Sequence, residues 1–307
     1  QIAAVSIIAT KMILSAGEDV ALAIALVIFV PIMVWLLHTP KNQAAAPDAK
    51  SAATPAVSQQ LTAGVLIPLP PGLTTGDEPL TKVQASNWKS LCEQLGDAYA
   101  PHDVLRALCA CHHDVARAER LVASNREWLE RYKPGQISPG SLAGSLPTRT
   151  YVYGGIARNG WPILECRVHR WRPDKYTVEE HIRMLAYLFH HIQLSNPAHD
   201  RFCVLFDMTG WHLGLASPHA MAMVFALIQM TQGPYCERLG AALIVNTPFI
   251  FRATWTVIQP LLDPRTASRV FMFGKHDWRG AVNELVDIDN LPADLGGRHP
   301  GGTLPDE

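Results

Sequence analysis

The sequence predicts an α/β protein in which helices pack on a mostly parallel β-sheet, preceded by a small all-α subdomain and a transmembrane helix. Three observations support this prediction. From about residue 150, short apolar strands alternate with longer helical segments, which is typical of parallel sheets covered by helices. Residues 81–134 contain three short amphipathic stretches of helical period, and residues 20–37 form a long apolar run without a charge.

The apolar run at residues 20–37 has 18 uncharged residues. As a helix it is about 27 Å long, close to the thickness of the hydrocarbon core of a bilayer. Pro31 kinks such a helix, which membrane spans tolerate, and Trp35 stands near its end, where interfacial aromatic residues are common. The alternatives are a buried core helix or the core of a signal peptide. We assign residues 1–38 to a membrane segment and expect a single-pass membrane protein.

Residues 39–80 have the composition of a tether. In residues 39–60, Ala, Pro, Ser and Thr account for 14 of 22 positions. Such a segment buries too little apolar surface to fold alone, so we expect partner proteins to hold it. The chain begins with Gln1, as expected of a cleaved organellar precursor or of a sequence whose start is missing. Residues 298–307 are expected to be a tail.

The charge balance excludes one class of function. Lys and Arg total 26 against 27 for Asp and Glu, without the basic excess of a nucleic-acid binder. Charged residues make up 17% of the chain, below the roughly 25% of soluble domains, which indicates membrane contact. The six cysteines are scattered through expected helices and strands, so we expect free thiols in a reducing compartment.

The regular elements follow in order along the chain. Expected helices occupy residues 81–99, 102–111, 115–132, 218–230 and 249–262. A further helix is expected to begin at the capping box of residues 177–180. Expected strands occupy residues 163–168, 202–206, 241–245 and 270–273. The helix at residues 249–262 is apolar on nearly every side, so it lies in a deep core or between a lipid pocket and a membrane. One of its broad faces carries Phe251, Trp255, Ile258 and Leu262.

Several motifs in the second half of the chain resemble the Sec14-like (CRAL-TRIO) lipid-binding family. Residues 235–240 read Tyr-Cys-Glu-Arg-Leu-Gly, residues 246–248 Asn-Thr-Pro, residues 259–266 Gln-Pro-Leu-Leu-Asp-Pro-Arg-Thr and residues 290–297 Asn-Leu-Pro-Ala-Asp-Leu-Gly-Gly. They are similar in content and order to the family's Y-P-E-R-L-G, N-A-P, K-P-F-L-D-x-x-T and N-L-P-x-x-x-G-G. The resemblance implies a helical N-terminal subdomain over residues 81–134 and a lipid-binding domain over residues 150–297.

The resemblance also implies a ligand site. Glu237, Arg238 and Arg269 match positions near an inositol-phosphate headgroup, where the arginines would grip phosphate and Glu237 would accept from sugar hydroxyls. The alternative is a structural ion pair of Glu237 with Arg238 or with another neighbour. The apolar cavity would be closed by the helix at residues 249–262, with the ligand against Phe251, Trp255, Ile258 and Leu262.

One departure from the family pattern bears on the ligand. The family's helical subdomain reads F-L-R-A-R-K-F-D, and here Cys111 and His112 stand in place of the second Arg and the Lys. A neutral thiol and a mostly neutral imidazole do not replace two permanent cations. We therefore expect a phospholipid of lower charge, or another hydrophobe, rather than a phosphoinositide.

Neither catalysis nor metal binding is expected. The chain has no nucleophile elbow and no phosphate-binding loop, and Asp207 ends a strand without a nucleophile beside it in sequence. Cys109 and Cys111 are about 200° apart on a helix, so they do not converge on one zinc ion. His181, His190 and His191 are expected to be solvated. A bound phospholipid is the only cofactor-like molecule that we expect.

Two functions remain open from the sequence. The first is a membrane-anchored Sec14-like protein that binds a phospholipid or another hydrophobic ligand without catalysis. The second is a structural accessory subunit of a multi-subunit organellar membrane complex, with the mitochondrial inner membrane as the expected location and a vestigial or permanently filled pocket. The expected partners are accordingly lipid, a membrane and other protein subunits.

The membrane assignment gives a direct prediction. Because residues 20–37 carry no charge and match the bilayer thickness, alkaline carbonate extraction of native membranes should leave the whole chain in the pellet. A peripheral protein of the same membranes serves as the control and should be released. Recovery of the chain in the supernatant would show that residues 20–37 do not span the bilayer.

Overall fold

The structure is a computed structural model that describes residues 80–195, 199–249, 251, 255, 259 and 262–305. The expected membrane helix at residues 20–37 and the tether, apart from residue 80, lie outside the described residues. Within the described part of the chain, no helix combines the length and the apolar character needed to cross a membrane.

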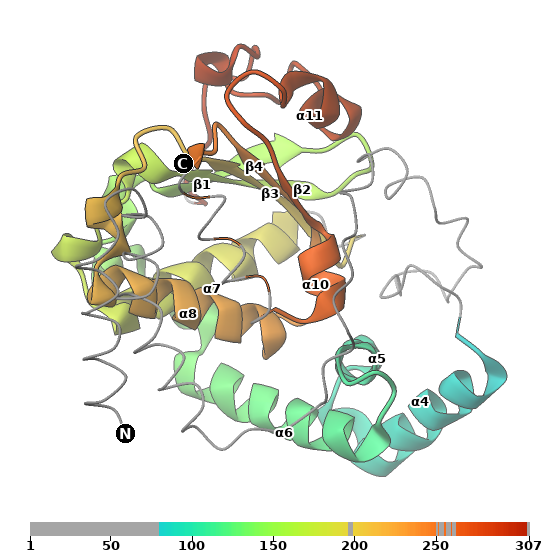
Figure 1. Cartoon of the computed structure of the whole chain (residues 1–307). Coiled ribbons are helices and arrows are strands. Elements are labelled where there is room, and N and C mark those ends of the chain that lie inside the picture. The colour runs from blue at the N-terminus through green and yellow to red at the C-terminus, as the bar shows by residue number, and fades with distance from the viewer. Residues whose placement is uncertain are drawn as a thin grey trace, which may run out of the picture.

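A five-stranded sheet forms the centre of the molecule, with strands in sequence order (Figure 1). The strands are β1 (Tyr151–Ile156), β2 (Pro162–Arg167), β3 (Phe202–Asp207), β4 (Leu239–Val245) and β5 (Val270–Met272). β2 to β5 are parallel, which confirms the mostly parallel sheet, and β1 pairs antiparallel with β2. The sequence prediction lacked β1. Its Gly154 lies against the Glu165 side chain of β2, where an added Cβ would come within 2.6 Å of the Glu165 Cγ.

Helices cover both faces of the sheet (Figure 1). α7 (Val178–Ser195) and α8 (Pro218–Gln232) pack on one face against side chains such as Leu164, Val204 and Ile244. α11 (Arg279–Leu285) packs on the other face against Ile163, Leu205 and Leu243. Consecutive strand residues point to opposite faces, so these largely apolar strands contribute to two cores at once.

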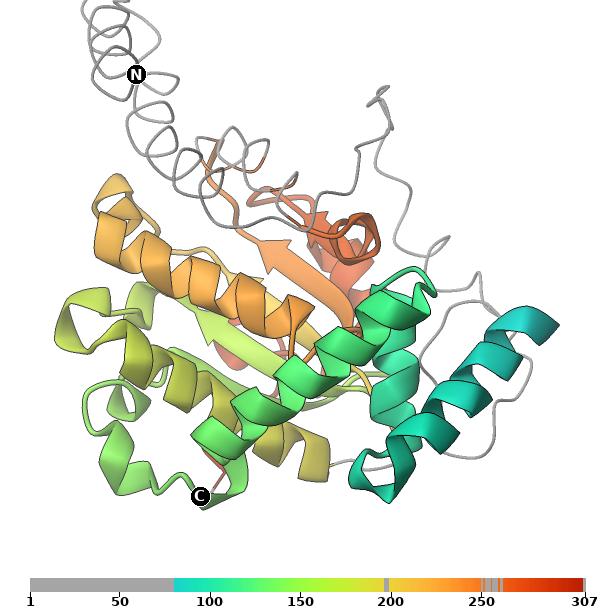
Figure 2. The same cartoon turned by 90° about the horizontal axis from the view of Figure 1, so that it is seen from below.

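A small helical subdomain precedes the sheet. It consists of α4 (Lys82–Leu95), α5 (Pro101–Ala110) and α6 (Val115–Tyr132), which share their own core of Leu91, Val104, Leu108 and Val122. The three expected helices are confirmed, although α4 ends at Gly96, whose φ of 67° breaks the helix. Figure 2 shows these blue-green to green helices on the same side of the sheet as α7 and α8.

The remaining elements are short. α10 (Pro264–Ser268) leads into β5. The 3₁₀ segments are Gly96–Ala98, Pro134–Gln136, Pro139–Leu142, Leu146–Thr148, Val168–Arg170, Pro173–Lys175, Leu213–Ala216 and Ala293–Leu295. All six cysteines are free thiols, and all except Cys92 are buried.

The expectation of a solvated histidine on α7 is wrong for His181. His181 is 1% exposed and stacks on Tyr176, while His190 and His191 are half-buried. His181 lies one turn before Leu185 on the buried stripe of α7, so its position faces the core whatever its polarity. Burial, followed by the nearby His219, lowers the pKa of His181 from 6.5 to about 4. The folded protein therefore holds this imidazole neutral.

The depressed pKa of His181 predicts a loss of stability in acid. Unfolded His181 takes up a proton below pH 6.5, whereas the folded residue resists protonation until about pH 4. The contribution of His181 to the free energy of unfolding is thus fully present above pH 6.5, and about 3 kcal/mol of it is lost as the pH falls to 4. In urea titrations, His181→Phe should lose less stability than the wild type over this window. The exposed His276→Gln variant is the control, and equal slopes for His181→Phe and the wild type would contradict the prediction.

Candidate functional site

Two of the predicted site residues come together at the start of the last two strands. Arg269 Nη1 donates to Glu237 Oε2 at 3.1 Å and to the Leu239 carbonyl oxygen at 3.1 Å. Because β4 and β5 are parallel neighbours, the residues that precede them meet at one edge of the sheet. Arg265 Nη1 lies 3.7 Å from the other oxygen, Glu237 Oε1. The Glu237 carboxylate is thus buried between two guanidinium groups of its own chain.

The third predicted residue, Arg238, turns away from Glu237. Its Nη1 donates to the Asp200 carbonyl oxygen at 3.4 Å, and its Nη2 lies 3.9 Å from Asp103 Oδ1. Glu237 thus pairs with another neighbour than Arg238, namely Arg269, with Arg265 close by, and Arg238 approaches two aspartates.

Arg106 of α5 completes an ionic cluster with these aspartates, in which the two arginines are buried and the Asp103 side chain is 46% exposed. Arg106 is 2% exposed, pairs with Asp103 one turn earlier, and its Nη1 lies 3.3 Å from Asp200 Oδ1. Burial lowers its pKa to about 10, with a further contribution from the neighbouring Arg238. Burial likewise lowers the pKa of Arg238, which the Asp200 carboxylate partly opposes. Two arginines and two aspartates thus join the helical subdomain to the sheet domain with no net charge.

Sequence reasoning gave Arg106 no role, although a signal was present. It is a lone charge in the otherwise apolar stretch Val104 to Cys109, which is buried throughout. Arginine is almost never fully buried unless it is paired, so a charged residue at such a position indicates an internal acidic partner.

The end of α5 carries no cation cluster. Cys111 is buried, and burial raises the pKa of its thiol. His112 adopts a φ of 51°, and its Nε2 lies 3.3 Å from Asp263 Oδ2. Beside them, Arg265 Nη1 donates to the Cys109 carbonyl oxygen at 3.2 Å. The position that resemblance assigns to two phosphate-binding cations is instead a contact between α5 and α10.

The apolar candidates lie around residues 249–262, of which the structure describes only a part. Phe251 packs on the core shared by the sheet, α7 and α8, and its ring meets that of Trp211 edge-on at a centroid distance of 5.5 Å. Trp255 and Leu262 are half-buried, and Ile258 lies outside the described residues. Of the four predicted apolar residues, Phe251 is thus the one whose apolar neighbours are known within the described residues.

The sheet face against which Phe251 packs, on the α7 and α8 side, is less completely covered than the opposite face. On β5, Val270 and Met272 point to the α7 and α8 side and are half-buried, whereas Phe271 points to the α11 side and is 3% exposed. Further half-buried apolar residues on the same core are Phe206, Trp211, Leu215 and Leu227. The β3 to β5 end of this face therefore presents accessible apolar surface.

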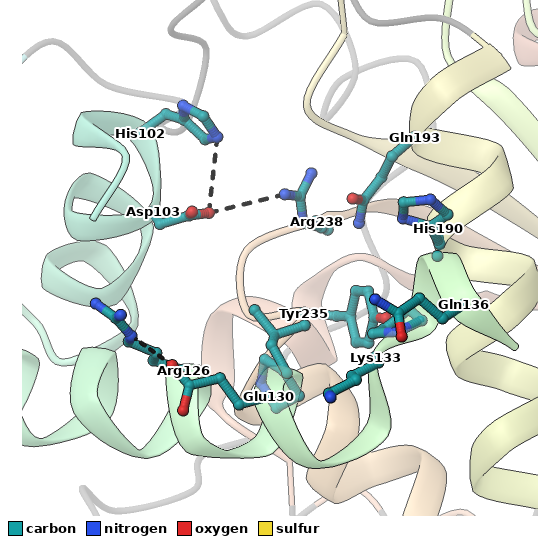
Figure 3. A pocket seen from close by; sticks show the side chains of 14 residues that line it. His102, Asp103, Arg126, Glu130, Lys133, Gln136, His190, Gln193, Tyr235 and Arg238 are labelled. Atoms are coloured by element: carbon teal, nitrogen blue, oxygen red, sulfur yellow. Dashed lines mark hydrogen bonds and ion pairs between the residues drawn. The ribbon is translucent and has the colours of Figure 1, made fainter. Parts of the chain in front are cut away.

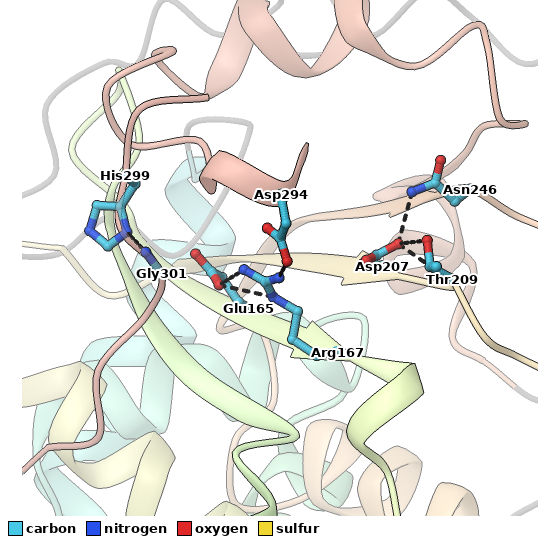
Figure 4. Close-up of polar contacts among 8 residues, drawn as sticks. All are labelled: Glu165, Arg167, Asp207, Thr209, Asn246, Asp294, His299 and Gly301. Carbon is cyan, nitrogen blue, oxygen red and sulfur yellow. Dashed lines mark hydrogen bonds and ion pairs between the residues drawn. The ribbon is translucent and has the colours of Figure 1, made fainter. Parts of the chain in front are cut away.

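On the α11 side, polar groups at the ends of the strands bond to one another (Figure 4). The Asp207 Oδ1 atom accepts from the Thr209 hydroxyl at 2.7 Å and from Asn246 Nδ2 at 2.8 Å. Glu165 Oε2 accepts from Arg167 Nη2 at 2.8 Å, and Arg167 also pairs with Asp294 of the C-terminal segment. Burial raises the pKa of Glu165, which the hydrogen bonds from Arg167 oppose. These contacts hold loops to the sheet and leave Asp207 in a structural role.

Comparison with protein families identifies the second half of the chain. Residues 147–297 match the family described as CRAL/TRIO domain. The chain contains a CRAL/TRIO domain. The matched residues include every strand of the sheet together with α7, α8, α10 and α11, and they end at the Gly-Gly pair of residues 296–297.

Relatives of the CRAL/TRIO domain and its helical subdomain are found among curated proteins. Alpha-tocopherol transfer protein-like of Homo sapiens is 26% identical over 234 residues, which cover 74% of this chain and 64% of the relative. SEC14 cytosolic factor of Candida glabrata is 25% identical over 238 residues, covering 71% of this chain and 75% of that protein. Clavesin-2 of Homo sapiens is 27% identical over 205 residues, covering 64% and 62%. The chain thus spans less than two thirds of the length of the human relatives.

A solved structure shares the fold. The crystal structure of Sfh5 superposes with a TM-score of 0.51 at 12% sequence identity, covering 64% of this chain and 82% of that chain. The predicted Sec14-like arrangement of a mixed sheet with packed helices is therefore confirmed for the described residues.

The buried cluster predicts strong coupling between the helical subdomain and the CRAL/TRIO domain. Removing one partner leaves an uncompensated buried charge, so Arg106→Met and Asp200→Asn should each lower the free energy of unfolding by about 3 kcal/mol. The double variant should lose clearly less than the sum of the two single losses.

The exposed pair of Lys89 and Glu93 at 3.9 Å provides the matched control for this cycle. Its disruption by Lys89→Met should cost about 0.5 kcal/mol or less. Urea denaturation measures all four variants, and additive losses for Arg106→Met and Asp200→Asn would show that the cluster does not act as a unit.

Proposed function

We propose that the chain binds a hydrophobic ligand, a phospholipid or another apolar lipid, between the sheet and residues 249–262, without catalysing a reaction. The observation that carries this proposal is the asymmetric burial of β5, where Val270 and Met272 are accessible and Phe271 is not. An apolar ligand on this face would bury acyl chains at about 0.8 kcal/mol per methylene, which is a sufficient source of affinity without any chemistry.

The relatives support a hydrophobic ligand. The CRAL/TRIO match and a relative named for the transfer of alpha-tocopherol fit the apolar surface around Phe206 and Met272. The absence of catalysis is proposed on chemical grounds. Asp207, the carboxylate at the end of a strand that the sequence analysis considered, has its Oδ1 atom engaged in structural hydrogen bonds from Thr209 and Asn246.

At the polar end of this site, we propose that Glu237, Arg265 and Arg269 favour a headgroup of low net charge. Glu237 balances part of the positive charge of the two arginines at distances of 3.1 Å and 3.7 Å. Cys111 and His112 add no permanent cation nearby. The negative charge of a phosphoinositide headgroup would therefore meet too little positive charge here, whereas a zwitterionic headgroup needs less.

We further propose that residues 20–37 anchor this lipid binder in a membrane, with the mitochondrial inner membrane as the first compartment to examine. A tethered domain cannot carry lipid over long distances, so it would extract or present lipid locally. The rival function is an accessory subunit of a membrane complex in which the lipid is permanent. The internal pairing of Glu237 favours this rival, because a structural ion pair persists without an exchangeable headgroup.

The first prediction concerns occupancy of the apolar face. The whole chain, purified in mild detergent, should retain about one lipid per protein, as measured by native mass spectrometry. Met272→Trp should reduce the retained lipid by about tenfold, because the larger ring fills space that acyl chains would occupy. The control is Val83→Trp, at a side chain on α4 that is 69% exposed. Full occupancy of the Met272→Trp variant would exclude this face as the site.

The second prediction concerns the headgroup. In exchange assays between vesicles, rates for phosphatidylinositol and phosphatidylcholine should differ by no more than about twofold, or under 0.5 kcal/mol. A strong preference for phosphatidylinositol that disappears in Arg269→Gln would contradict the proposal. Retained lipid that fails to exchange with either vesicle type would favour the accessory subunit.

A further inference from the structure

The helical subdomain contacts the rest of the chain through both ends of α5. At the start of α5, which lines the cavity shown in Figure 3, Asp103 lies 3.9 Å from Arg238 Nη2 and also pairs with Arg106. His102 Nε2 lies 3.7 Å from the same carboxylate, but burial, followed by the neighbouring Arg106, lowers the pKa of this imidazole. The contact at the start of α5 therefore depends on arginines, which stay charged, and it changes little with pH near neutrality.

The end of α5 is held by a side chain that can change its charge. His112 Nε2 lies 3.3 Å from Oδ2 of Asp263, the N-cap residue of α10. The side chain of His112 is 56% exposed and that of Asp263 is 25% exposed, so solvent protons reach the pair. Histidine is the side chain that gains or loses a proton between about pH 5 and 8. The contact is therefore an ion pair when the imidazole of His112 is protonated, and no ion pair when it is neutral.

The backbone of the turn after α5 fixes where His112 lies. His112 and His113 are consecutive residues with positive φ, of 51° and 63°. This left-handed conformation is uncommon for residues with a side chain and persists where the surrounding structure holds it. Here His112 N donates to the Cys109 carbonyl oxygen at 3.1 Å, and His113 N donates to the Leu108 carbonyl oxygen at 2.7 Å. The backbone thus brings His112 to α10 in either charge state.

On the α10 side, one further charge lies beside the pair. Arg265 Nη1 donates to the Cys109 carbonyl oxygen at 3.2 Å and lies 3.7 Å from Glu237 Oε1, so its charge is already shared. The first carboxylate oxygen of Asp263, Oδ1, accepts from Arg265 N at 2.9 Å as the cap of α10. This division leaves Oδ2 of Asp263 to face His112.

On the α5 side, the neighbouring side chains stay neutral. Burial, followed by Arg265 and His112, lowers the pKa of His113, and burial raises the pKa of the Cys111 thiol. The remaining charged groups on this side belong to α6 and its N-cap, and they are Asp114, Arg117 and Arg120. Asp263 is the carboxylate that contacts His112 among the described residues. The charge of His112 therefore decides how strongly α5 and α10 attract each other.

We propose that His112 and Asp263 form a proton-dependent latch between the helical subdomain and α10, which holds more strongly when His112 is protonated. α10 leads into β5, whose Val270 and Met272 belong to the accessible apolar face. The effect of the latch on lipid rests on the proposed lipid site at that face. Because α10 borders this site, restraining α10 slows the entry and exit of lipid. Lipid exchange should thus be slower in mildly acidic than in mildly basic solution.

The latch acts against the general effect of acid on this fold. Burial keeps His181 neutral in the folded protein, so acid lowers the free energy of unfolding through that residue. A less stable fold opens more readily and would release lipid faster as the pH falls. Slower exchange in acid therefore indicates the latch and is not explained by His181.

The first test is a double-mutant cycle by urea denaturation of the whole chain in detergent, at about pH 5.5 and about pH 8. His112→Asn keeps a side chain that tolerates positive φ, and Asp263→Asn keeps a good N-cap for α10. The coupling between the two positions should be about threefold in the unfolding equilibrium constant in acid, as expected of an exposed ion pair, and absent in base. The control is the exposed pair of Lys89 and Glu93, whose charges do not change over this range, so its coupling should be the same at both pH values.

The second test measures lipid exchange with phosphatidylcholine vesicles at the same two pH values. The wild type should exchange about threefold more slowly in acid than in base. His112→Lys, which carries a permanent cation at a positive φ that Lys133 also adopts, should exchange slowly at both values. Asp263→Asn should exchange fast at both values. The control His276→Asn, at an exposed loop residue, should keep the pH dependence of the wild type.

The outcomes of the two tests are distinguishable. Coupling of the same size at both pH values, or at neither, overturns the latch whether or not lipid is bound. Coupling that appears only in acid, in a chain that retains no lipid, supports the latch and contradicts the proposed lipid site. Coupling that appears only in acid, together with lipid exchange that does not change with pH, overturns the effect of the latch on lipid.

Discussion

The pairing of the buried Arg106 and Arg238 with Asp103 and Asp200 is the constraint on which the arrangement of the two halves depends. α5 contributes Asp103 and Arg106, and the segments before β3 and β4 contribute Asp200 and Arg238. A charge this deeply buried is tolerated only with its partners in place, so α5 can dock on the sheet domain in one position. That position in turn places the end of α5 against α10 and the side of α6 across from α7.

The same docking gives Cys111 and His112, at the end of α5, a structural environment that needs no cation at either position. His112 meets Asp263, the N-cap of α10, and Arg265 of α10 reaches back to the Cys109 carbonyl oxygen. Since α10 directly follows residues 249–262, this contact ties the helical subdomain to the segment proposed to close the lipid site. A contact of an imidazole with a carboxylate and a single hydrogen bond at a surface are weak, at about 1 kcal/mol each, so they can hold this segment in place and still allow it to move away.

Much of the fold could be predicted because local pattern and tertiary packing agree. α6 begins and ends where its apolar period predicts, and the buried strands β3, β4 and β5 lie within two residues of their expected bounds. β1 was missed because its Gly154 and Gly155 lower strand propensity, and its antiparallel pairing with β2 has no local signal. For the candidate site, Glu237, Arg238 and Arg269 stay predictions, and their partners could not be predicted because they depend on which strand ends meet. His181 shows the converse case, in which position on the buried stripe outweighs residue polarity.

The turn before β4 links the ionic cluster to the polar end of the proposed lipid site. Glu237 has a φ of 59°, an unusual conformation for a residue with a side chain. It points to Arg269 at the edge of the sheet, while the next residue, Arg238, points to Asp200 and Asp103. Two adjacent charged residues thus serve opposite sides of one turn. Any shift of Arg238 acts on the backbone that also holds Glu237, so the ionic cluster between the two halves and the polar end of the proposed lipid site are joined through a single peptide unit.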